Sequence, residues 1–102
     1  MQNSRKRYYV LRFQSDTGPS RLECYDNEKK FNQNGQPRSV IQLSECWKIT
    51  EITNAKHQYT IGFHINDDCY SLYAESAEEF ESWLVAVDEV KNSKRDQSKN
   101  NG

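Results

Sequence analysis

Three consecutive basic residues near the N-terminus, Arg5-Lys6-Arg7, are the residues of this sequence whose types and spacing best suit ligand chemistry. A planar guanidinium group donates paired hydrogen bonds to phosphate oxygens, and a loop held between strands can aim several such groups at one phosphorylated ligand. An ordinary solvated loop explains the same cluster equally well when the cluster is taken alone. The interpretation therefore depends on the elements that would hold this loop in place.

Basic and acidic residues are unevenly distributed along the 102 residues, whose formal net charge is −1. Residues 1–56 contain ten Lys and Arg against six Asp and Glu, residues 57–91 contain one against eight, and residues 92–102 contain three against one. A compact fold would then have a basic and an acidic side, and a basic face on a nearly neutral protein predicts a local anionic partner. Lys29, Lys30 and Lys48 would each add about 1 kcal/mol of attraction near an anionic bilayer.

No arrangement of titratable residues in the sequence is typical of an enzyme. His57 and His64 are seven positions apart, and His64 falls on the polar side of a predicted strand, where a solvent-exposed imidazole is the simpler interpretation. The sequence has no HExxH, GxSxG or P-loop pattern, and most carboxylates fall on the exposed side of a predicted helix. We therefore expect neither catalysis nor a cofactor. The aromatic residues lie within strand patterns rather than among the cations, which argues against nucleic acid as a partner.

The three cysteines, Cys24, Cys46 and Cys69, are odd in number and lack CxxC spacing. This pattern predicts reduced thiols in an intracellular protein, and the strand patterns around them predict core positions. The first residues lead into no apolar segment of a signal peptide, and no run of 18 apolar residues exists. Neither secretion nor a membrane span is expected.

Alternation of apolar and polar residues predicts a β-hairpin in the second half of the chain. Residues 58–65 place four apolar residues on one face, namely Tyr59, Ile61, Phe63 and Ile65. Asn66-Asp67-Asp68 then turns the chain, and residues 69–74 return with three residues facing one way, namely Tyr70, Leu72 and Ala74.

Further strands are predicted in the first half. Residues 7–13 have Tyr9, Leu11 and Phe13 inward, and residues 21–25 form the second half of a hairpin. Residues 26–37 are polar and are predicted as a loop, and two more strands follow at residues 39–43 and 47–52. Five or six short strands at this spacing predict an antiparallel barrel or sandwich.

The last part of the chain has helical spacing instead. Ser76 and Glu79 fit a capping box, in which both side chains accept hydrogen bonds from backbone N–H groups at the start of a helix. Five apolar residues then form one stripe, namely Phe80, Trp83, Leu84, Val87 and Val90. We predict a helix over residues 77–91, whose acidic first turn suits the helix dipole, and a flexible polar tail over residues 92–102. The fold class is mainly β with one amphipathic helix at the C-terminal end.

This order of elements, with Trp83 in the middle of the last helix, resembles a pleckstrin-homology (PH) domain. That fold is an antiparallel β-sandwich or partly open barrel capped by a C-terminal amphipathic helix. Residues 5–12 (RKRYYVLR) and 21–31 (RLECYDNEKKF) are similar to the domain of the insulin receptor substrate family, and residues 38–43 and 46–49 continue the likeness. The related Dok adaptors match residues 22–31 less well.

The resemblance covers residues 5–91, which are the predicted PH-like domain, and it departs from the family at the start. Domains of this family begin with a strand that carries a phosphate-binding lysine, whereas only residues 1–4 precede Arg5 here. The first strand is therefore expected to be missing, which would leave unpaired backbone groups on the neighbouring strand.

The resemblance implies a non-catalytic adaptor domain that is cytoplasmic and peripheral at the inner face of the plasma membrane. It would bind phosphoinositide headgroups in signalling downstream of an insulin-type receptor tyrosine kinase, with the acidic start of the helix facing away from the bilayer. The family pattern of Lys or Arg, any residue and Arg before an aromatic residue matches Arg5 and Arg7, and Arg38 matches a further basic position. The candidate binding residues are Arg5, Lys6, Arg7, Lys29, Lys30 and Arg38. The alternative is a protein-interaction module that binds a peptide or an acidic protein segment without specific lipid binding.

Overall fold

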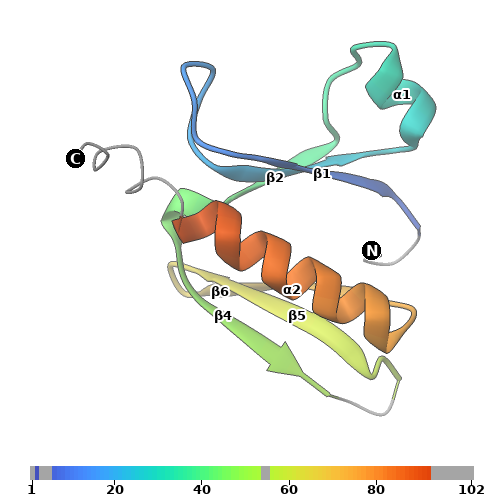
Figure 1. The fold of residues 1–102 in the computed structure, drawn as a ribbon, viewed down its shortest axis with the longest axis vertical. Helices are drawn as coiled ribbons and strands as arrows, with labels where there is room; N and C mark the ends of the chain where they lie inside the picture. Colours follow the sequence, from blue (N-terminus) through green and yellow to red (C-terminus); the bar gives the residue numbers. More distant parts are fainter. Residues whose placement is uncertain (1, 3–5, 54–55, 93–102) are drawn as a thin grey trace.

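Two three-stranded antiparallel sheets and one long helix make up the part of the chain that the computed structural model describes, namely residue 2, residues 6–53 and residues 56–92 (Figure 1). The first sheet contains β1 (Tyr8–Arg12), β2 (Arg21–Tyr25) and β3 (Ser39–Gln42) in that order. The second contains β4 (Cys46–Ile52), β5 (Tyr59–Ile65) and β6 (Asp68–Ala74). A short 3-10 helix, η1 (Leu43–Glu45), connects the two sheets.

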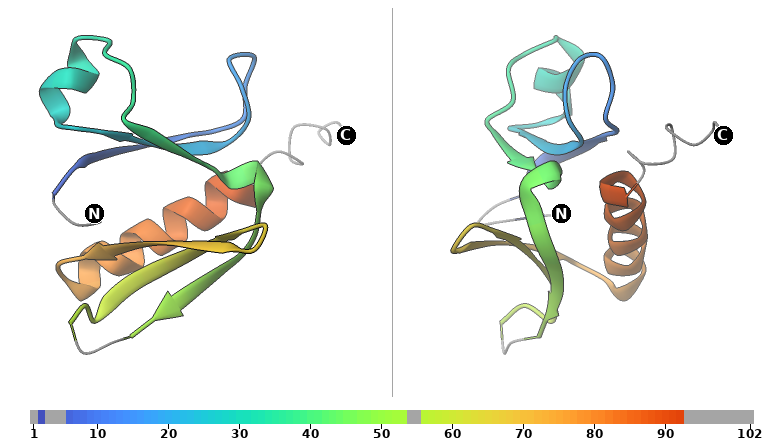
Figure 2. Two further views of the ribbon diagram at one scale, coloured as in Figure 1. Left: turned by 180° about the vertical axis from the view of Figure 1, so that it is seen from behind. Right: turned by 90° about the vertical axis from the view of Figure 1, so that its left-hand side faces the viewer.

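The long helix, α2 (Ala77–Asn92), packs along one side of the two sheets, as the right-hand view in Figure 2 shows. The predicted mainly β fold with a C-terminal amphipathic helix is confirmed. No described strand pairs bridge the two sheets, so they form an open sandwich rather than a closed barrel. Among the described residues, no helix has the length and hydrophobicity of a membrane span.

The first sheet follows the predicted alternation over most of its length. Tyr8 lies opposite Tyr25 and Leu11 lies opposite Leu22, and Tyr9 and Leu11 pack against the core as expected. The inward position predicted for Phe13 is wrong, because the paired part of β1 ends one residue earlier and the Phe13 side chain is 49% exposed.

The second sheet supplies the centre of the core. Ile61 and Phe63 of β5 are fully buried, which confirms the apolar face of the predicted hairpin. Ile65 lies opposite Asp68, so the turn consists of two residues only, and Asn66 adopts a left-handed φ of 54°, which asparagine tolerates. The indole N–H of Trp47 donates a 3.0 Å hydrogen bond to the carbonyl oxygen of Asn66 and holds this turn against β4.

The start of α2 has the predicted reciprocal capping. The Ser76 hydroxyl accepts a 3.1 Å hydrogen bond from the Glu79 N–H, and the Glu79 carboxylate accepts one of 2.9 Å from the Glu75 N–H. This second bond holds the pKa of Glu79 below its usual value. The apolar stripe faces the sheets, since Val87 and Val90 are buried. Each large buried side chain of the stripe stabilises the fold by roughly 1.5–3 kcal/mol.

The loop predicted over residues 26–37 is wrong in part, because it contains a short helix, α1 (Glu28–Asn32). The Asn27 side chain caps this helix by accepting a 2.9 Å hydrogen bond from the Lys30 N–H. Phe31 packs on the outer face of the first sheet, with its ring centroid 5.4 Å from that of Tyr8 and 5.2 Å from that of Tyr25. A five-residue helix with one apolar residue has no detectable period, so hydrophobic periodicity does not reveal it.

Two predictions about the outer face of the second sheet are also wrong. Cys24 and Cys46 are buried as expected, but Cys69 is exposed because it lies opposite His64 on the outer face of the sheet. His64 is half-buried rather than solvent-exposed, since its Nε2 lies 3.0 Å from the Thr50 hydroxyl and 3.8 Å from the Cys69 thiol. Of the predicted tail, residues 93–102 lie outside the described residues, and residue 92 is the last residue of α2.

Candidate anion-binding site

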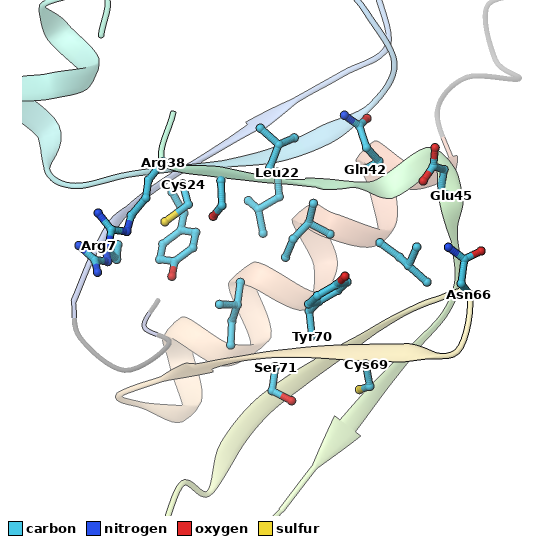
Figure 3. Close-up of a pocket in the computed structure, with 16 residues that line it drawn as sticks. Arg7, Leu22, Cys24, Arg38, Gln42, Glu45, Asn66, Cys69, Tyr70 and Ser71 are labelled. Atoms are coloured by element: carbon cyan, nitrogen blue, oxygen red, sulfur yellow. The ribbon is translucent and has the colours of Figure 1, made fainter. Parts of the chain in front are cut away.

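Arg7 and Arg38 lie next to each other at one end of the first sheet, where both bind the carboxylate of Asp26 (Figure 3). The Nη1 atoms of Arg7 and Arg38 lie 3.0 and 2.8 Å from the same oxygen, Oδ1 of Asp26. The Arg7 side chain is mostly buried, with 14% of its surface exposed, whereas Arg38 is 53% exposed. Two guanidinium groups are therefore held around one anionic oxygen at the protein surface.

The strand pairing of the first sheet positions these three residues. Arg7 immediately precedes β1 and Asp26 immediately follows β2, and Tyr8 pairs with Tyr25, so the arginine and the carboxylate are the next pair in register. Arg38 precedes β3, and its backbone N–H donates a 2.6 Å hydrogen bond to the Cys24 carbonyl. Each charged group is thus fixed by the end of a different strand.

Lys29 and Lys30, two further predicted site residues, are exposed on α1. Figure 1 shows that α1 stands above the end of the first sheet where β1 begins and β2 ends, which is also the end that carries Arg7. Because Phe31 anchors α1 on the sheet, both lysines are held near this end and add positive charge to it.

Lys6 is exposed beside Arg7, but an acidic segment lies close to it. The pKa of Glu79 is lowered mainly by the hydrogen bond from the Glu75 N–H, and the positive charge of Lys6 lowers it further. The Gln2 side-chain amide donates to the Glu75 carboxylate. The acidic start of α2 therefore lies close to Lys6, because Gln2 pairs with Tyr73 at the end of β6, directly before α2. Arg5, the remaining predicted site residue, lies outside the described residues.

Two other arginines of the first sheet are bound to a buried carboxylate. Glu23 is only 6% exposed and accepts hydrogen bonds from the Tyr25 hydroxyl at 2.7 Å, from Arg21 Nε at 2.9 Å and from Arg12 Nε at 3.1 Å. Burial acts to raise the pKa of Glu23, but these bonds outweigh burial and the pKa lies below its usual value. Arg12 and Arg21 therefore stabilise the sheet by satisfying a buried carboxylate, whereas Arg38 pairs with the partly exposed Asp26.

A groove of about 860 Å³ extends from the arginine pair along the side of the molecule away from α2 (Figure 3). It lies between β3 and β6, with Arg7 and Arg38 at one end and Glu45 and Asn66 at the other, and the Tyr70 side chain points into it. Its apolar lining comes from both sheets and includes Leu22, Ile41, Ile65 and Leu72. Because the sheets do not close, part of the core surface is open to a ligand here.

Sequence reasoning missed Asp26, the residue that joins the two arginines. A signal for it exists, because the predicted hairpin of residues 7–13 and 21–25 pairs Arg7 with Asp26 once the register is known. The register depends on the turn between the strands, and the polar pattern of that turn does not specify it.

The fold agrees with the comparison to known families. The chain belongs to the PH domain family, whose model matches residues 2–92. It is 40% identical over 92 residues to insulin receptor substrate 2-A of Xenopus laevis, an alignment that covers 85% of this chain and 8% of that protein.

Two further relatives carry related names. The chain is 38% identical over 89 residues to insulin receptor substrate 1 of Xenopus tropicalis, covering 84% of this chain and 14% of that protein. It is 34% identical over 89 residues to insulin receptor substrate 1 of Mus musculus, covering 85% of this chain and 7% of that protein. The chain thus spans a small fraction of the length of the relatives it matches.

Proposed function

We propose that this PH domain binds phosphoinositide headgroups through Arg7 and Arg38 and thereby holds a signalling adaptor at the inner face of the plasma membrane. The observation that supports the proposal is the convergence of these two guanidinium groups on one oxygen of Asp26. The similarity to insulin receptor substrates supports an adaptor role near an insulin-type receptor tyrosine kinase. The binding unit would be the predicted domain of residues 5–91.

The chemistry of the site favours a phosphate group over a carboxylate. A phosphate monoester carries more negative charge than the Asp26 carboxylate and has three acceptor oxygens, so it satisfies more of the donors on Arg7 and Arg38. Asp26 supplies one negative charge against two positive charges, which leaves the pair cationic. A headgroup phosphate would bind on the exposed Arg38 side and share the arginines with Asp26.

Charges around the pair set the long-range attraction to a membrane. Lys29 and Lys30 on α1 attract an anionic bilayer, with about 1 kcal/mol for each lysine near the surface. Lys6 contributes less attraction to the bilayer, because the negative charge of the neighbouring Glu79 offsets part of its positive charge. We therefore expect α1 and the arginine pair, rather than the start of α2, to face the bilayer.

Vesicle co-sedimentation tests the proposal. Wild-type protein should bind phosphatidylcholine vesicles containing a phosphoinositide more tightly than vesicles without it, and the affinity should fall as salt rises, because exposed charges are screened within about 8–10 Å. The Arg7→Ala and Arg38→Ala variants should each bind about tenfold or more weakly, since each loses charge-assisted hydrogen bonds to phosphate.

Lys91→Ala is the matched control, because Lys91 is in the last turn of α2, whereas Gln2 pairs with Tyr73 directly before the first turn and Lys6 lies close to Glu79 in that turn. It also removes one positive charge and should leave vesicle binding nearly unchanged. Far-UV circular dichroism would confirm that each variant is folded. Equal binding by wild type and both arginine variants, with and without phosphoinositide, would contradict the proposal.

A further inference from the structure

The outer edge of β6 has backbone groups that point into the groove. In an antiparallel sheet, the N–H and C=O groups of successive residues point alternately to the two sides of a strand. The Tyr73 N–H and C=O bind Gln2 across the outer edge, both at 2.8 Å. By this alternation the backbone groups of Ser71 and Cys69 point to the same edge, where no described residue pairs with them.

The edge of β3 borders the groove from the other side. The Leu43 N–H donates a 3.1 Å hydrogen bond to the Ser20 carbonyl, across the side of the strand that faces β2. The backbone groups of Val40 and Gln42 therefore point away from β2, and both residues line the groove. Two strand edges, whose outward backbone groups have no partner strand among the described residues, thus border one groove of mixed polar and apolar lining, an arrangement that accepts an added strand.

We infer that the groove between β3 and β6 binds an extended peptide segment of a partner protein, which adds as a strand along β6 and places an acidic residue at Arg7 and Arg38. The charge at the two ends of the groove argues for this occupant. The arginine pair forms one end, whereas Glu45 and Asn66 form the other, so an acidic residue is favoured at one end only (Figure 3).

The pairing at Tyr73 sets the direction of the peptide. Gln2 runs antiparallel to β6 at this edge, and a peptide that continues the same pattern pairs with Ser71 and Cys69. Its N-terminal end then lies at Arg7, because β6 runs away from the Glu45 end and toward the arginine end. At about 3.3 Å per residue, a segment of about five residues spans β6 from Asp68 to Leu72, because Gln2 occupies the edge at Tyr73. Alternate side chains of this segment face Tyr70 and the apolar part of the lining.

This inference goes beyond the proposed function and does not depend on it. Both ligands use the arginine pair, but only the peptide uses Tyr70 and the backbone edge of β6. The Tyr70 side chain is 47% exposed, which leaves it accessible to a peptide. Variants at Tyr70 therefore separate the two activities.

Selection from a random nonapeptide phage library on the immobilised 102-residue chain tests the inference. The selected peptides should carry an acidic residue near the N-terminus, followed by alternating apolar residues. Addition of a synthesised selected peptide should slow amide hydrogen exchange at Ser71 and Cys69. The Tyr70→Ala variant should bind this peptide about tenfold more weakly, as expected for loss of a buried aromatic contact, and should bind phosphoinositide vesicles like wild type.

Val85→Ala is the control for lost apolar surface, because Val85 is 65% exposed on α2 and does not line the groove. It should change neither binding activity. Arg7→Ala should weaken binding of the selected peptide. It should also weaken binding of phosphoinositide vesicles, but only if the proposed lipid site is correct. Failure to select any peptide, or protection of amides elsewhere, would overturn the inference. Concentration-dependent protection of Ser71 and Cys69 without peptide would assign the edge to a second copy of the chain and would overturn it as well.

Discussion

Arg7 and Arg38 precede different strands and donate to the same carboxylate oxygen, Oδ1 of Asp26, at 3.0 and 2.8 Å. Two like charges repel each other, so the carboxylate between them is what allows both to lie at one surface position. The same carboxylate competes with any external anion for these donors. Asp26 is therefore both the residue that assembles the site and the residue that limits its affinity.

Asp26→Asn should increase binding to phosphoinositide vesicles. The asparagine keeps an oxygen that accepts hydrogen bonds from both arginines but removes the negative charge, so the site becomes more positive by one unit. One unit of charge near an anionic surface contributes about 1 kcal/mol, which predicts about a fivefold gain in affinity at low salt. Co-sedimentation over a series of lipid concentrations would measure this gain.

Asp16→Asn changes the net charge of the protein by the same amount at an exposed turn. Asp16 lies between β1 and β2, at the opposite end of the first sheet from Asp26. This control variant should bind vesicles like wild type at moderate salt. A gain of the same size in both variants would show that net charge, and not the arginine pair, determines binding.

Glu23→Gln should destabilise the fold by about 1–3 kcal/mol at neutral pH, because the buried carboxylate accepts hydrogen bonds from two arginines and Tyr25. The pKa of Glu23 is lowered in the folded protein, so its stabilising contribution is complete above the usual value of 4.5 and is lost as the pH falls through the folded value. The stability curves of wild type and variant should therefore converge in acid. Urea denaturation at a series of pH values would measure both effects.

Glu51→Gln is the comparison for this experiment, since Glu51 is an exposed carboxylate on β4. Its effect on the free energy of unfolding should stay within about 0.5 kcal/mol. A Glu23→Gln effect that is as small as this, or that is constant with pH, would disagree with the role assigned to the buried network.

The parts of the fold that sequence could predict are those with a long and regular pattern. The face of β5 with Ile61 and Phe63 is strictly alternating, and the stripe of α2 extends over several turns, so both follow from periodicity. The helix α1 was missed because Phe31 is its one apolar residue and its cap at Asn27 is a purely local feature. Phe13 was misplaced because a strand end depends on the turn that follows it.

The sequence indicated which basic residues belong to the candidate site, but not how these residues are held together. The resemblance to PH domains implied Arg7 and Arg38, and the structure brings these two together. The role of Asp26 depends on strand register, and the proximity of Glu79 to Lys6 depends on how residue 2 pairs with β6. Contacts of this kind join segments far apart in the chain, and no local pattern encodes them.

Gly62→Ala should destabilise the protein by about 1–3 kcal/mol, as overpacking does in a filled site. An added Cβ would lie 2.7 Å from Thr50 Oγ1, 2.9 Å from Ile52 Cδ1 and 3.1 Å from Cys69 Sγ. These distances are shorter than normal contacts, so the neighbours must move apart. Thermal unfolding followed by circular dichroism would measure the loss.

Combination with Thr50→Ala tests the cause of that loss, because this second change removes the nearest atom. The double variant should be less destabilised than the sum of the two single variants, although Thr50→Ala alone loses the hydrogen bond to His64. Additive effects would mean that the cost of Gly62→Ala comes from the backbone conformation at residue 62 and not from crowding of the added Cβ against Thr50.

Cys69 should react with a maleimide or iodoacetamide far faster than Cys24 and Cys46. Its thiol is exposed on the outer face of the second sheet, whereas Cys24 and Cys46 are 8% and 4% exposed and react only when the fold opens. For opening that costs about 5 kcal/mol, the buried thiols are protected by roughly a thousandfold or more. Mass spectrometry of timed samples should show one rapid addition, which the Cys69→Ser variant abolishes, and two further additions only in urea. A second rapid addition in native buffer would contradict the burial of Cys24 and Cys46.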